Sequence, residues 1–472
     1  MLTFVDVLEA LSGLRPDGMD WVISETVIDS RHAVPRSLFV ALTGERLDGH
    51  DYVQDAFNRG ASYALVHRDM SNEFQQLDLR SDWHPEALSA FRGKPFCLRV
   101  EDTLNGLQQL ARYWRRKINV RVIGITGSVG KTTTKEVVAE VLNQRYRTLK
   151  NPGNLNNEIG LPLTILRLQE NHERAVLEMG FYVPGEIALL CDIASPQIGV
   201  ITNIGTVHAE RAGSQEMIAR GKAELVESLP DEGIAILNYD DNRVREMADK
   251  TRAKIFFYGL NPEADLWADG VEGLGLEGIR FRLHYRNEVL YLRVPLIGRH
   301  SVHTSLRAAA VGLIEGLTWQ EIFNGLRSDR AQLRLVAVRA RNGALILDDT
   351  YNASPESTLA ALNLLDELEG RKVGVLGDML ELGQYEWRGH EMVGVRAAEV
   401  VDELITVGER GRMIATAASQ AGLPDQVITE FEDSQDAIQY LEEHLRSNDV
   451  VLVKGSHGMR MDEIVTALES PE

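Results

Sequence analysis

Residues 120–142 read VRVIGITGSVGKTTTKEVVAEVL, and this stretch decides the fold. An apolar, β-rich run ends in a glycine-rich turn, and the turn opens a segment with Val137, Val138, Val141 and Leu142 on one helical face. Strand, glycine loop and helix in this order are the context that a phosphate-binding loop requires. The stretch therefore predicts an α/β sheet with a nucleoside triphosphate site at its edge.

The loop supplies the groups that an anion needs. Glycines let backbone N–H groups approach the phosphates, and the N-terminus of the following helix adds its dipole. Lys131 is predicted to reach the terminal phosphates, and the Thr132 hydroxyl to bind magnesium. The full motif has a glycine where this chain has Ile125, so the shorter TGxxGKT form is present. The predicted nucleotide-binding residues of the loop are Gly127, Ser128, Val129, Gly130, Lys131, Thr132 and Thr133.

The alternation of strands and helices continues beyond the loop. Near-continuous apolar strands separated by helical segments predict a mostly parallel sheet covered on both faces. Residues 279–294 alternate apolar and polar side chains instead, which predicts a small antiparallel pair. Ser354 followed by Pro355 predicts a helix start. The apolar runs are RAVLEMG, IGVITNIG and GIAILN before the antiparallel pair, and ALILDDT, KVGVLG, ELITVG and DVVLVKGS after it.

The 472 residues are too many for one typical core, and about three domains are expected. We predict a small α/β N-terminal domain over residues 1–100 and a central P-loop domain with a doubly wound, mostly parallel sheet over 101–328. A Rossmann-like C-terminal domain is predicted over 329–472. Residues 68–95 are polar and rich in turn formers, which indicates a loop or an insertion.

Composition narrows the function classes. No apolar run approaches the about 20 residues of a membrane helix, and the N-terminus lacks the features of a secretory signal, so we expect a cytoplasmic protein without a membrane span. Cys97 and Cys191 are expected to be buried free thiols. The formal charge of −20 repels polyanions, so no nucleic-acid partner is expected. The basic stretch 112–121, with Arg115, is predicted to be a solvated helix end, the alternative being an anion-binding patch.

An ordered set of motifs resembles the Mur ligase family. In the central region these are TGSVGKTTTKE, NPGNLNNEIGLPLTIL, EMG and NIGTVHAE. Asp29-Ser30-Arg31 with VPRSLFVALTGERLDGHDY resembles the family's UDP-binding domain, and DDTYNASPEST, GDMLELG and VKGSHG resemble its third domain. The resemblance covers essentially the whole chain.

The resemblance implies an ATP-dependent amide ligase of peptidoglycan synthesis. The branch that it fits best adds D-alanyl-D-alanine to a UDP-N-acetylmuramoyl tripeptide through an acyl phosphate, a reaction governed by positioning and charge neutralisation. ATP and magnesium are the implied cofactors. The acidic surface and separate domains are compatible with a monomer.

The resemblance also implies roles for particular residues. Glu178, at the carboxyl end of a predicted strand, is expected to bind magnesium, and His208 a second metal. Lys222 matches a lysine that carbon dioxide carbamylates in this family, which would exchange a repelling ammonium for oxygen ligands. Lys131, Glu178, His208 and Lys222 are thus the predicted catalytic residues.

Further residues are predicted to contact the substrates. Arg334 and Asp349 resemble third-domain residues that contact ATP, and the alternative for both is an inter-strand salt bridge. Asn154 is expected to face the reaction centre. The candidates for the uridine nucleotide are Ser30, Arg31 and His50.

Two features depart from the family pattern. Ser301 and Thr304 stand where relatives commonly carry asparagines near adenine, so the adenine contacts are expected to differ. Phe181 and Tyr182 follow Glu178 where relatives have smaller residues. The competing hypotheses are another amide ligase of the superfamily, such as a folylpolyglutamate-like enzyme, and a nucleotide-switch ATPase that binds a protein partner.

Overall fold

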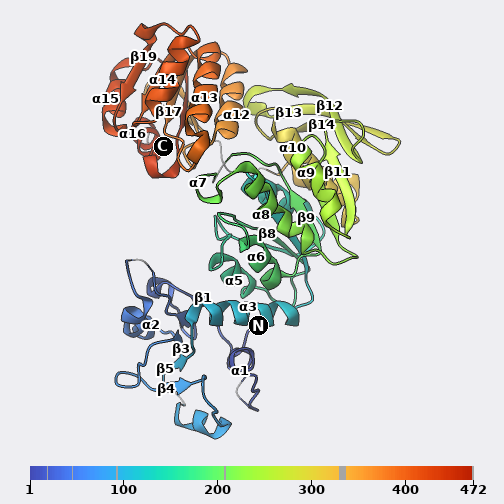
Figure 1. The fold of residues 1–472 in the computed structure, drawn as a ribbon, viewed down its shortest axis with the longest axis vertical. Coiled ribbons are helices and arrows are strands. Elements are labelled where there is room, and N and C mark those ends of the chain that lie inside the picture. Colours follow the sequence, from blue (N-terminus) through green and yellow to red (C-terminus); the bar gives the residue numbers. More distant parts are fainter. Residues whose placement is uncertain (19, 45, 92–93, 207–208, 329–335, 470–472) are drawn as a thin grey trace. The chain divides into compact units, whose positions relative to one another are not determined.

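The computed structural model describes residues 1–472 except 19, 45, 92–93, 207–208, 329–335 and 470–472 (Figure 1). Within this part of the chain the strands form sheets of five, nine and six strands. Contacts divide the chain into two compact units. The first consists of Met1–Gly124, Tyr146–Gly180 and Ala188–Gln197, and the second of Ile125–Arg145, Phe181–Ile187 and Ile198–Glu472. The predicted domain boundaries are not tested by this division and stay predictions.

The first unit contains the five-stranded sheet, in the order β1-β2-β3-β5-β4, with every pair parallel. Phe39, Ala64, Val66 and Cys97 from its strands form part of a buried core. The strands are β1 (Thr26–Val27), β2 (Leu38–Val40), β3 (Tyr63–Val66), β4 (Gln76–Asp78) and β5 (Phe96–Arg99). Three helices accompany them, namely α1 (Phe4–Ser12), α2 (Val53–Asn58) and α3 (Thr103–Lys117). The region 68–95, expected to be a loop or an insertion, contains β4 and the 3-10 helix Pro85–Phe91.

At the basic end of α3, Arg115 differs from the prediction. Arg115, predicted to be solvated, is only 7% exposed and donates hydrogen bonds to four carbonyl oxygens. These bonds run to Ala194 at 2.7 Å, Ile118 at 3.2 Å, Val120 at 3.0 Å and Ser195 at 3.4 Å. The guanidinium carries five donors in a fixed fork, so it satisfies several carbonyls together. The prediction was wrong because two of these acceptors, in Ala194 and Ser195, lie far away in the sequence.

The strand before the phosphate loop is β6 (Arg121–Thr126), and the helix after it is α4 (Lys131–Leu142). In the first unit β7 (Thr148–Lys150) pairs in parallel with β8 (Arg174–Glu178). The second unit carries β9 (Ile198–Ile201), β10 (Ile234–Asn238) and β11 (Lys254–Gly259) as parallel neighbours. The almost complete burial of β6, β8, β9 and β10 agrees with the prediction of a sheet covered on both faces, whereas β7 and β11 are only partly buried.

The antiparallel pair predicted over 279–294 is confirmed as β13 (Ile279–Tyr285) and β14 (Glu288–Val294). A third strand, β12 (Leu266–Gly273), pairs antiparallel with β13 and parallel with β11. The register of β12 shifts between Asp269 and Glu272, and this irregularity hides its alternation in the sequence. The other helices of residues 160–326 are α5 (Gly160–Ile165), α6 (Glu186–Ala194), α7 (Ala209–Ala212), α8 (Gln215–Glu227), α9 (Asn242–Arg245), α10 (Ser301–Ile314) and α11 (Trp319–Leu326).

The six-stranded sheet has the order β15-β16-β20-β17-β18-β19 and is parallel except for β15. One core cluster packs α12, α13 and α14 against one face, and a second packs α15 and α16 against the other, which gives the predicted doubly wound arrangement (Figure 1). The strands are β15 (Val336–Arg339), β16 (Leu345–Asp348), β17 (Arg371–Gly377), β18 (Glu403–Val407), β19 (Ile428–Phe431) and β20 (Asp449–Lys454). The helices are α12 (Pro355–Asp366), α13 (Glu386–Val400), α14 (Gly411–Gln420), α15 (Ser434–His444) and α16 (Asp462–Leu468).

The predicted helix start at Ser354 is confirmed. The Ser354 hydroxyl accepts a hydrogen bond from the backbone N–H of Ser357 at 3.2 Å, and Pro355 occupies the first helical position of α12. This capping fixes where the chain turns from β16 into α12. The residues between these two elements line the cavity described below.

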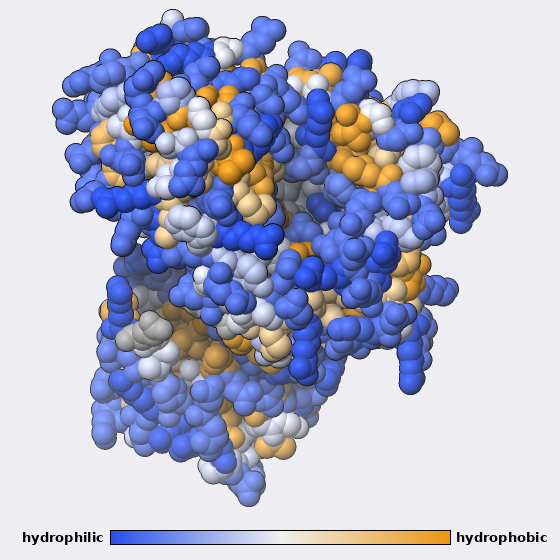
Figure 2. Space-filling view, turned by 45° about the horizontal axis from the view of Figure 1, so that its top comes forward, coloured by the Kyte–Doolittle hydropathy of each residue, from blue (hydrophilic) through white to orange (hydrophobic). Residues whose placement is uncertain are grey.

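The surface is mostly hydrophilic in the view of Figure 2, with hydrophobic residues in small scattered patches. No described helix combines the length and the apolar character needed to cross a bilayer. Cys97 and Cys191 are both buried, as predicted.

Candidate active site

The phosphate loop depends on two glycines with unusual backbone angles. Gly127 has φ of 147° and Gly130, the N-cap of α4, has φ of 82°. A Cβ atom on Gly127 would lie 1.8 Å from the Thr202 hydroxyl oxygen, which is an impossible approach. The loop therefore closes against the segment after β9 only because residue 127 has no side chain.

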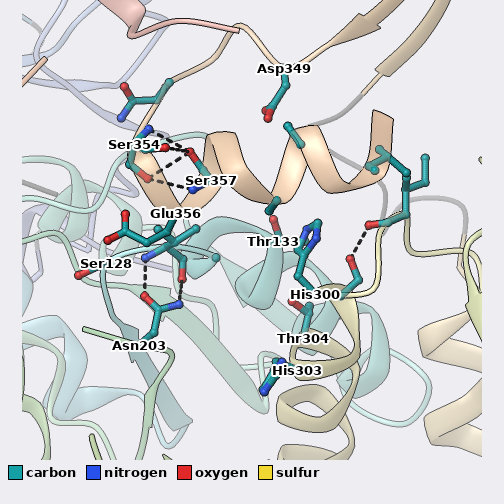
Figure 3. Close-up of a pocket in the computed structure, with 18 of the residues that line it drawn as sticks. Ser128, Thr133, Asn203, His300, His303, Thr304, Asp349, Ser354, Glu356 and Ser357 are labelled. Atoms are coloured by element: carbon teal, nitrogen blue, oxygen red, sulfur yellow. Dashed lines mark hydrogen bonds between the residues drawn. The ribbon is translucent and has the colours of Figure 1, made fainter. Parts of the chain in front are cut away.

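That segment holds the loop in place (Figure 3). Asn203 accepts from the backbone N–H of Val129 at 3.0 Å and donates to the Val129 carbonyl at 3.2 Å. The Asn203 carbonyl accepts from the Ser128 N–H at 2.9 Å, and the Thr202 hydroxyl donates to the Val129 carbonyl at 2.7 Å. These bonds fix the loop before any ligand binds. Asn203 was not among the predicted site residues, although a polar residue just after a buried strand is a usable signal.

Two lysines meet at one carbonyl of the loop. Lys131 donates to the carbonyl oxygen of Gly127 at 2.9 Å and to that of Ser128 at 3.2 Å. Lys222, on α8, donates to the same Gly127 oxygen at 2.9 Å and is only 1% exposed. Its amine lies 4.8 Å from the ring centroid of Phe181.

The surroundings of Lys222 change its acid–base behaviour. Burial, and then the positive charge of Lys131, lower the pKa of the Lys222 amine well below its usual value. A neutral amine is the form that reacts with carbon dioxide. The site of Lys222 thus has the chemistry that the predicted carbamate requires.

Glu178, at the end of β8 in the first unit, is 2% exposed and accepts from the side-chain amide of Asn156 at 2.9 Å. Its backbone N–H donates to the side chain of Asn151 at 2.9 Å, and Asn151 donates back to the Glu178 carbonyl at 3.1 Å. Asn151 and Asn156 are therefore the asparagines of this segment that position Glu178. Asn154 is exposed, and its predicted place at the reaction centre stays a prediction.

A cavity of about 380 Å³ adjoins the phosphate loop within the second unit. The loop residues Ser128, Val129, Gly130 and Thr133 form one wall (Figure 3). Helix α10 forms another, with His300, Ser301, His303, Thr304 and Arg307. The third wall comes from the stretch between β16 and α12 and from Lys454. The position beside the phosphate loop makes this cavity the candidate nucleotide site.

Asp349 lines this cavity and forms the inter-strand ion pair considered as its alternative. Its carboxylate lies 2.6 Å from the amine of Lys454, which ends the neighbouring strand β20 and is 2% exposed. Lys454 also donates to the Asn352 carbonyl at 2.8 Å. Contact of Asp349 with a nucleotide stays a prediction. Lys454 was missed because its partner is about a hundred residues away in sequence.

Ser301 and Thr304 use their hydroxyl groups within the protein. Ser301 donates to the carbonyl of Ile297 at 2.7 Å, and Thr304 accepts from Arg307 at 2.8 Å. Hydroxyl groups that are engaged in this way have fewer hydrogen bonds left for adenine than the amide groups of asparagine side chains would have. This arrangement is consistent with the expected difference in adenine contacts.

The uridine-nucleotide candidates lie in the first unit. His50 is 2% exposed, with one ring nitrogen 2.6 Å from Asp48 and the other accepting from the His67 N–H at 3.1 Å. Ser30 is buried, and Arg31 is exposed and paired with Asp29 at 2.6 Å. Of these side chains Arg31 is the one open to solvent. Their contacts with a uridine nucleotide stay predictions.

Two predicted residues, His208 and Arg334, lie outside the described residues. Within the described residues no three His, Cys, Asp or Glu side chains gather as a ready-made metal centre. Magnesium commonly binds one or two carboxylates together with substrate phosphates and waters, so it does not need such a cluster. The buried Glu178 and the loop hydroxyl of Thr132 are ligands of the right hardness.

Comparison with known protein families agrees with this geometry. The chain matches the profile described as "Mur ligase family, catalytic domain" over residues 22–115. It matches "Mur ligase middle domain" over 125–312 and "Mur ligase, glutamate ligase domain" over 333–457. These matches span most of the chain.

Individual proteins are similar over nearly the full length. The UDP-N-acetylmuramoyl-tripeptide--D-alanyl-D-alanine ligase of Bacillus subtilis is 36% identical, covering 99% of both chains. The crystal structure of MurF from Acinetobacter baumannii superposes with a TM-score of 0.84 at 30% identity, covering 98% of both chains. That of MurF ligase from Thermotoga maritima in complex with ADP gives 0.77 at 28% identity, covering 94% of this chain and 96% of that one. With its three-domain α/β architecture and mostly parallel sheets, the chain belongs to the Mur ligase family.

Proposed function

We propose that this chain is the ligase that joins D-alanyl-D-alanine to UDP-N-acetylmuramoyl tripeptide during peptidoglycan precursor synthesis. The relatives named for this reaction match the chain over nearly its whole length. The observation that carries the proposal is the preformed phosphate loop, held by Asn203 and shared by Lys131 and Lys222. ATP would be consumed, and ADP and phosphate released. These substrates support the predicted cytoplasmic location.

The proposed chemistry has two steps. First, a terminal carboxylate oxygen of the tripeptide forms a bond to the γ-phosphorus while the bond from that phosphorus to ADP breaks. The dipeptide amine then attacks the acyl carbon, loses a proton and expels phosphate, which leaves an amide. Lys131 and the backbone N–H groups at the start of α4 would balance the charge of the phosphates in the first step.

We further propose that magnesium is held by Thr132, Glu178 and a carbamate on Lys222, with His208 as ligand of a second metal. The burial of the Lys222 amine and the lowering of its pKa support this assignment, because they favour the neutral amine from which a carbamate forms. Magnesium when bound would neutralise phosphate charge and orient the reacting oxygens. Arg334 and Asp349 are proposed to contact ATP, Asn154 to face the acyl group, and Ser30, Arg31 and His50 to bind the uridine nucleotide.

Phosphate release with different amines tests the proposal. The protein is assayed with ATP, magnesium and UDP-N-acetylmuramoyl tripeptide, and with D-alanyl-D-alanine, D-glutamate, diaminopimelate or no amine. Of these amines, we expect that only D-alanyl-D-alanine supports phosphate release. We expect no release in the Lys131→Ala variant. Turnover with another amine would assign the chain to another ligase of the family. Hydrolysis without any amine would favour the nucleotide-switch ATPase.

A further inference from the structure

Arg307, on α10, is a buried cation that has no acidic partner among the described residues. Its side chain is 4% exposed, yet it forms no ion pair with a described Asp or Glu residue. The guanidinium donates to the Thr304 hydroxyl at 2.8 Å and to the Tyr258 hydroxyl at 3.3 Å, and it lies 5.6 Å from the Tyr258 ring centroid. Its Nε atom has no hydrogen-bond partner among the described residues. A buried charge of this kind is costly unless an anion compensates it.

The carboxylate of Asp240, which interacts electrostatically with Tyr258, is already engaged. Asp240 accepts from His303 at 2.8 Å and from the backbone N–H groups of Leu260 and Asn261 at 2.7 and 3.1 Å. Tyr258, which touches Arg307, donates its own hydroxyl to the carbonyls of Ile201 and Thr202. The surroundings thus fix the guanidinium in place without neutralising it.

The open side of Arg307 is the nucleotide cavity, which it lines together with the phosphate loop. A Cβ atom built on Gly130 would lie 3.4 Å from the Nη2 atom, so the guanidinium reaches the N-terminus of α4. This helix end is itself partially positive, and Lys131 follows directly. Such a concentration of positive charge favours an anionic ligand at this point of the cavity.

The chemistry of the guanidinium narrows the group that it binds. Arginine only donates hydrogen bonds, so its partner must be an acceptor. Adenine offers a donor amine and uncharged ring nitrogens, whereas phosphate oxygens accept hydrogen bonds and also carry the negative charge that compensates a buried cation. We propose that Arg307 binds a phosphate group of the nucleotide and is a second cation of the phosphate site beside Lys131. The inference rests on the proposed use of ATP.

The test separates phosphate binding from base binding. Adenosine, ADP and ATP are titrated calorimetrically into the unaltered protein, Arg307→Met and Arg307→Lys. The matched control is Arg280→Met, at an exposed position of β13. We expect Arg307→Met to weaken ADP and ATP binding about 10- to 100-fold, as loss of a charged hydrogen bond does, and adenosine binding less than about twofold. Arg307→Lys should retain part of the affinity, and Arg280→Met all of it.

Other outcomes overturn the inference. Unchanged ADP affinity in Arg307→Met would make Arg307 structural. An equal loss for adenosine and ADP, or a changed ratio of ADP to GDP affinity, would make it a base-reading residue, because guanine offers two acceptors to arginine. If Arg307→Met does not fold, Arg307→Lys takes its place in the test. An equal fall of its adenosine and ADP affinities would likewise make Arg307 a base-reading residue. If the unaltered protein does not bind ADP, both the ligase function and the phosphate contact of Arg307 are overturned. If it hydrolyses ATP without an amine while the Arg307 variants lose nucleotide affinity as expected, only the ligase function is overturned.

Discussion

Lys131 and Lys222 donate hydrogen bonds to the same carbonyl oxygen, that of Gly127, each at 2.9 Å. Two ammonium groups on one acceptor repel each other, and the buried Lys222 loses its proton more readily. One lysine of the pair is thus suited to phosphate binding and the other to covalent modification. Sharing the acceptor couples α4 and α8 at the point where the phosphates are expected.

We predict that Lys222 carries a carbamate when the protein is equilibrated with ¹³C-labelled bicarbonate. Carbon dioxide adds to a neutral amine, and the environment of Lys222 favours that form. Nuclear magnetic resonance should show one protected carbamate signal that disappears in Lys222→Ala. The exposed Lys250→Ala variant should keep the signal. Its persistence in Lys222→Ala would contradict the assignment.

Replacing Asn203 should loosen the phosphate loop. Asn203→Ala removes both side-chain hydrogen bonds to Val129, while the Val129 carbonyl keeps the bond from the Thr202 hydroxyl, and the two lost bonds should cost about 1–3 kcal/mol in unfolding free energy. ADP affinity should fall in parallel. Chemical denaturation and calorimetry measure the two effects. Asn324→Ala, at an exposed site on α11, should change stability by less than about 0.5 kcal/mol. Equal effects of the two variants would refute a special role for Asn203.

The ion pair of Asp349 and Lys454 should be strongly coupled. Lys454→Met removes the amine that lies 2.6 Å from the Asp349 carboxylate, and breaking a buried pair in this way costs about 3–5 kcal/mol. The double variant Asp349→Asn with Lys454→Met should recover part of that loss, because no uncompensated charge remains. Denaturant titrations of the four proteins give the coupling energy. Additive effects would show that the pair does not act as a unit.

Acid should destabilise the first unit through Asp6. Burial alone would raise the pKa of Asp6, but hydrogen bonds from Lys117, Thr3 and Arg15 hold it at about 2, below its ordinary 3.8. Because the folded-state pKa is depressed, the contribution is present above pH 3.8 and is lost as the pH falls towards 2. Its size is about 2 kcal/mol. Unfolding free energies of Asp6→Asn should vary less with pH in this window, and an unchanged dependence would contradict the assignment.

The local pattern around residues 120–142 was sufficient to predict β6, the loop and α4, because each step depends on neighbouring residues. Likewise, Ser354 and Pro355 predict the start of α12 from local backbone chemistry. Arg115 and Arg307 could not be predicted in this way. An arginine on a helix is usually solvated, and their burial depends on groups brought together by the fold, such as the carbonyl of Ala194 and the ring of Tyr258.

In the candidate active site too, contacts between distant residues could not be predicted from local sequence. Lys131 and Lys222 were named from motifs, but their common acceptor follows only from the packing of α8 against the loop. Asn203 and Lys454 stand in motifs that were quoted for family resemblance, and their partners lie 74 and 105 residues away. Contacts over such separations are set by sheet topology, which apolar patterns alone do not specify.

Transfer of labelled oxygen tests the central claim most directly. UDP-N-acetylmuramoyl tripeptide with ¹⁸O in its terminal carboxylate is incubated with the protein, ATP, magnesium and D-alanyl-D-alanine, and the released phosphate is analysed by mass spectrometry. An acyl phosphate at this loop predicts one ¹⁸O atom in each phosphate and the other in the product peptide. Phosphate without ¹⁸O, with both labels left in the tripeptide, would contradict the account and indicate simple ATP hydrolysis by water.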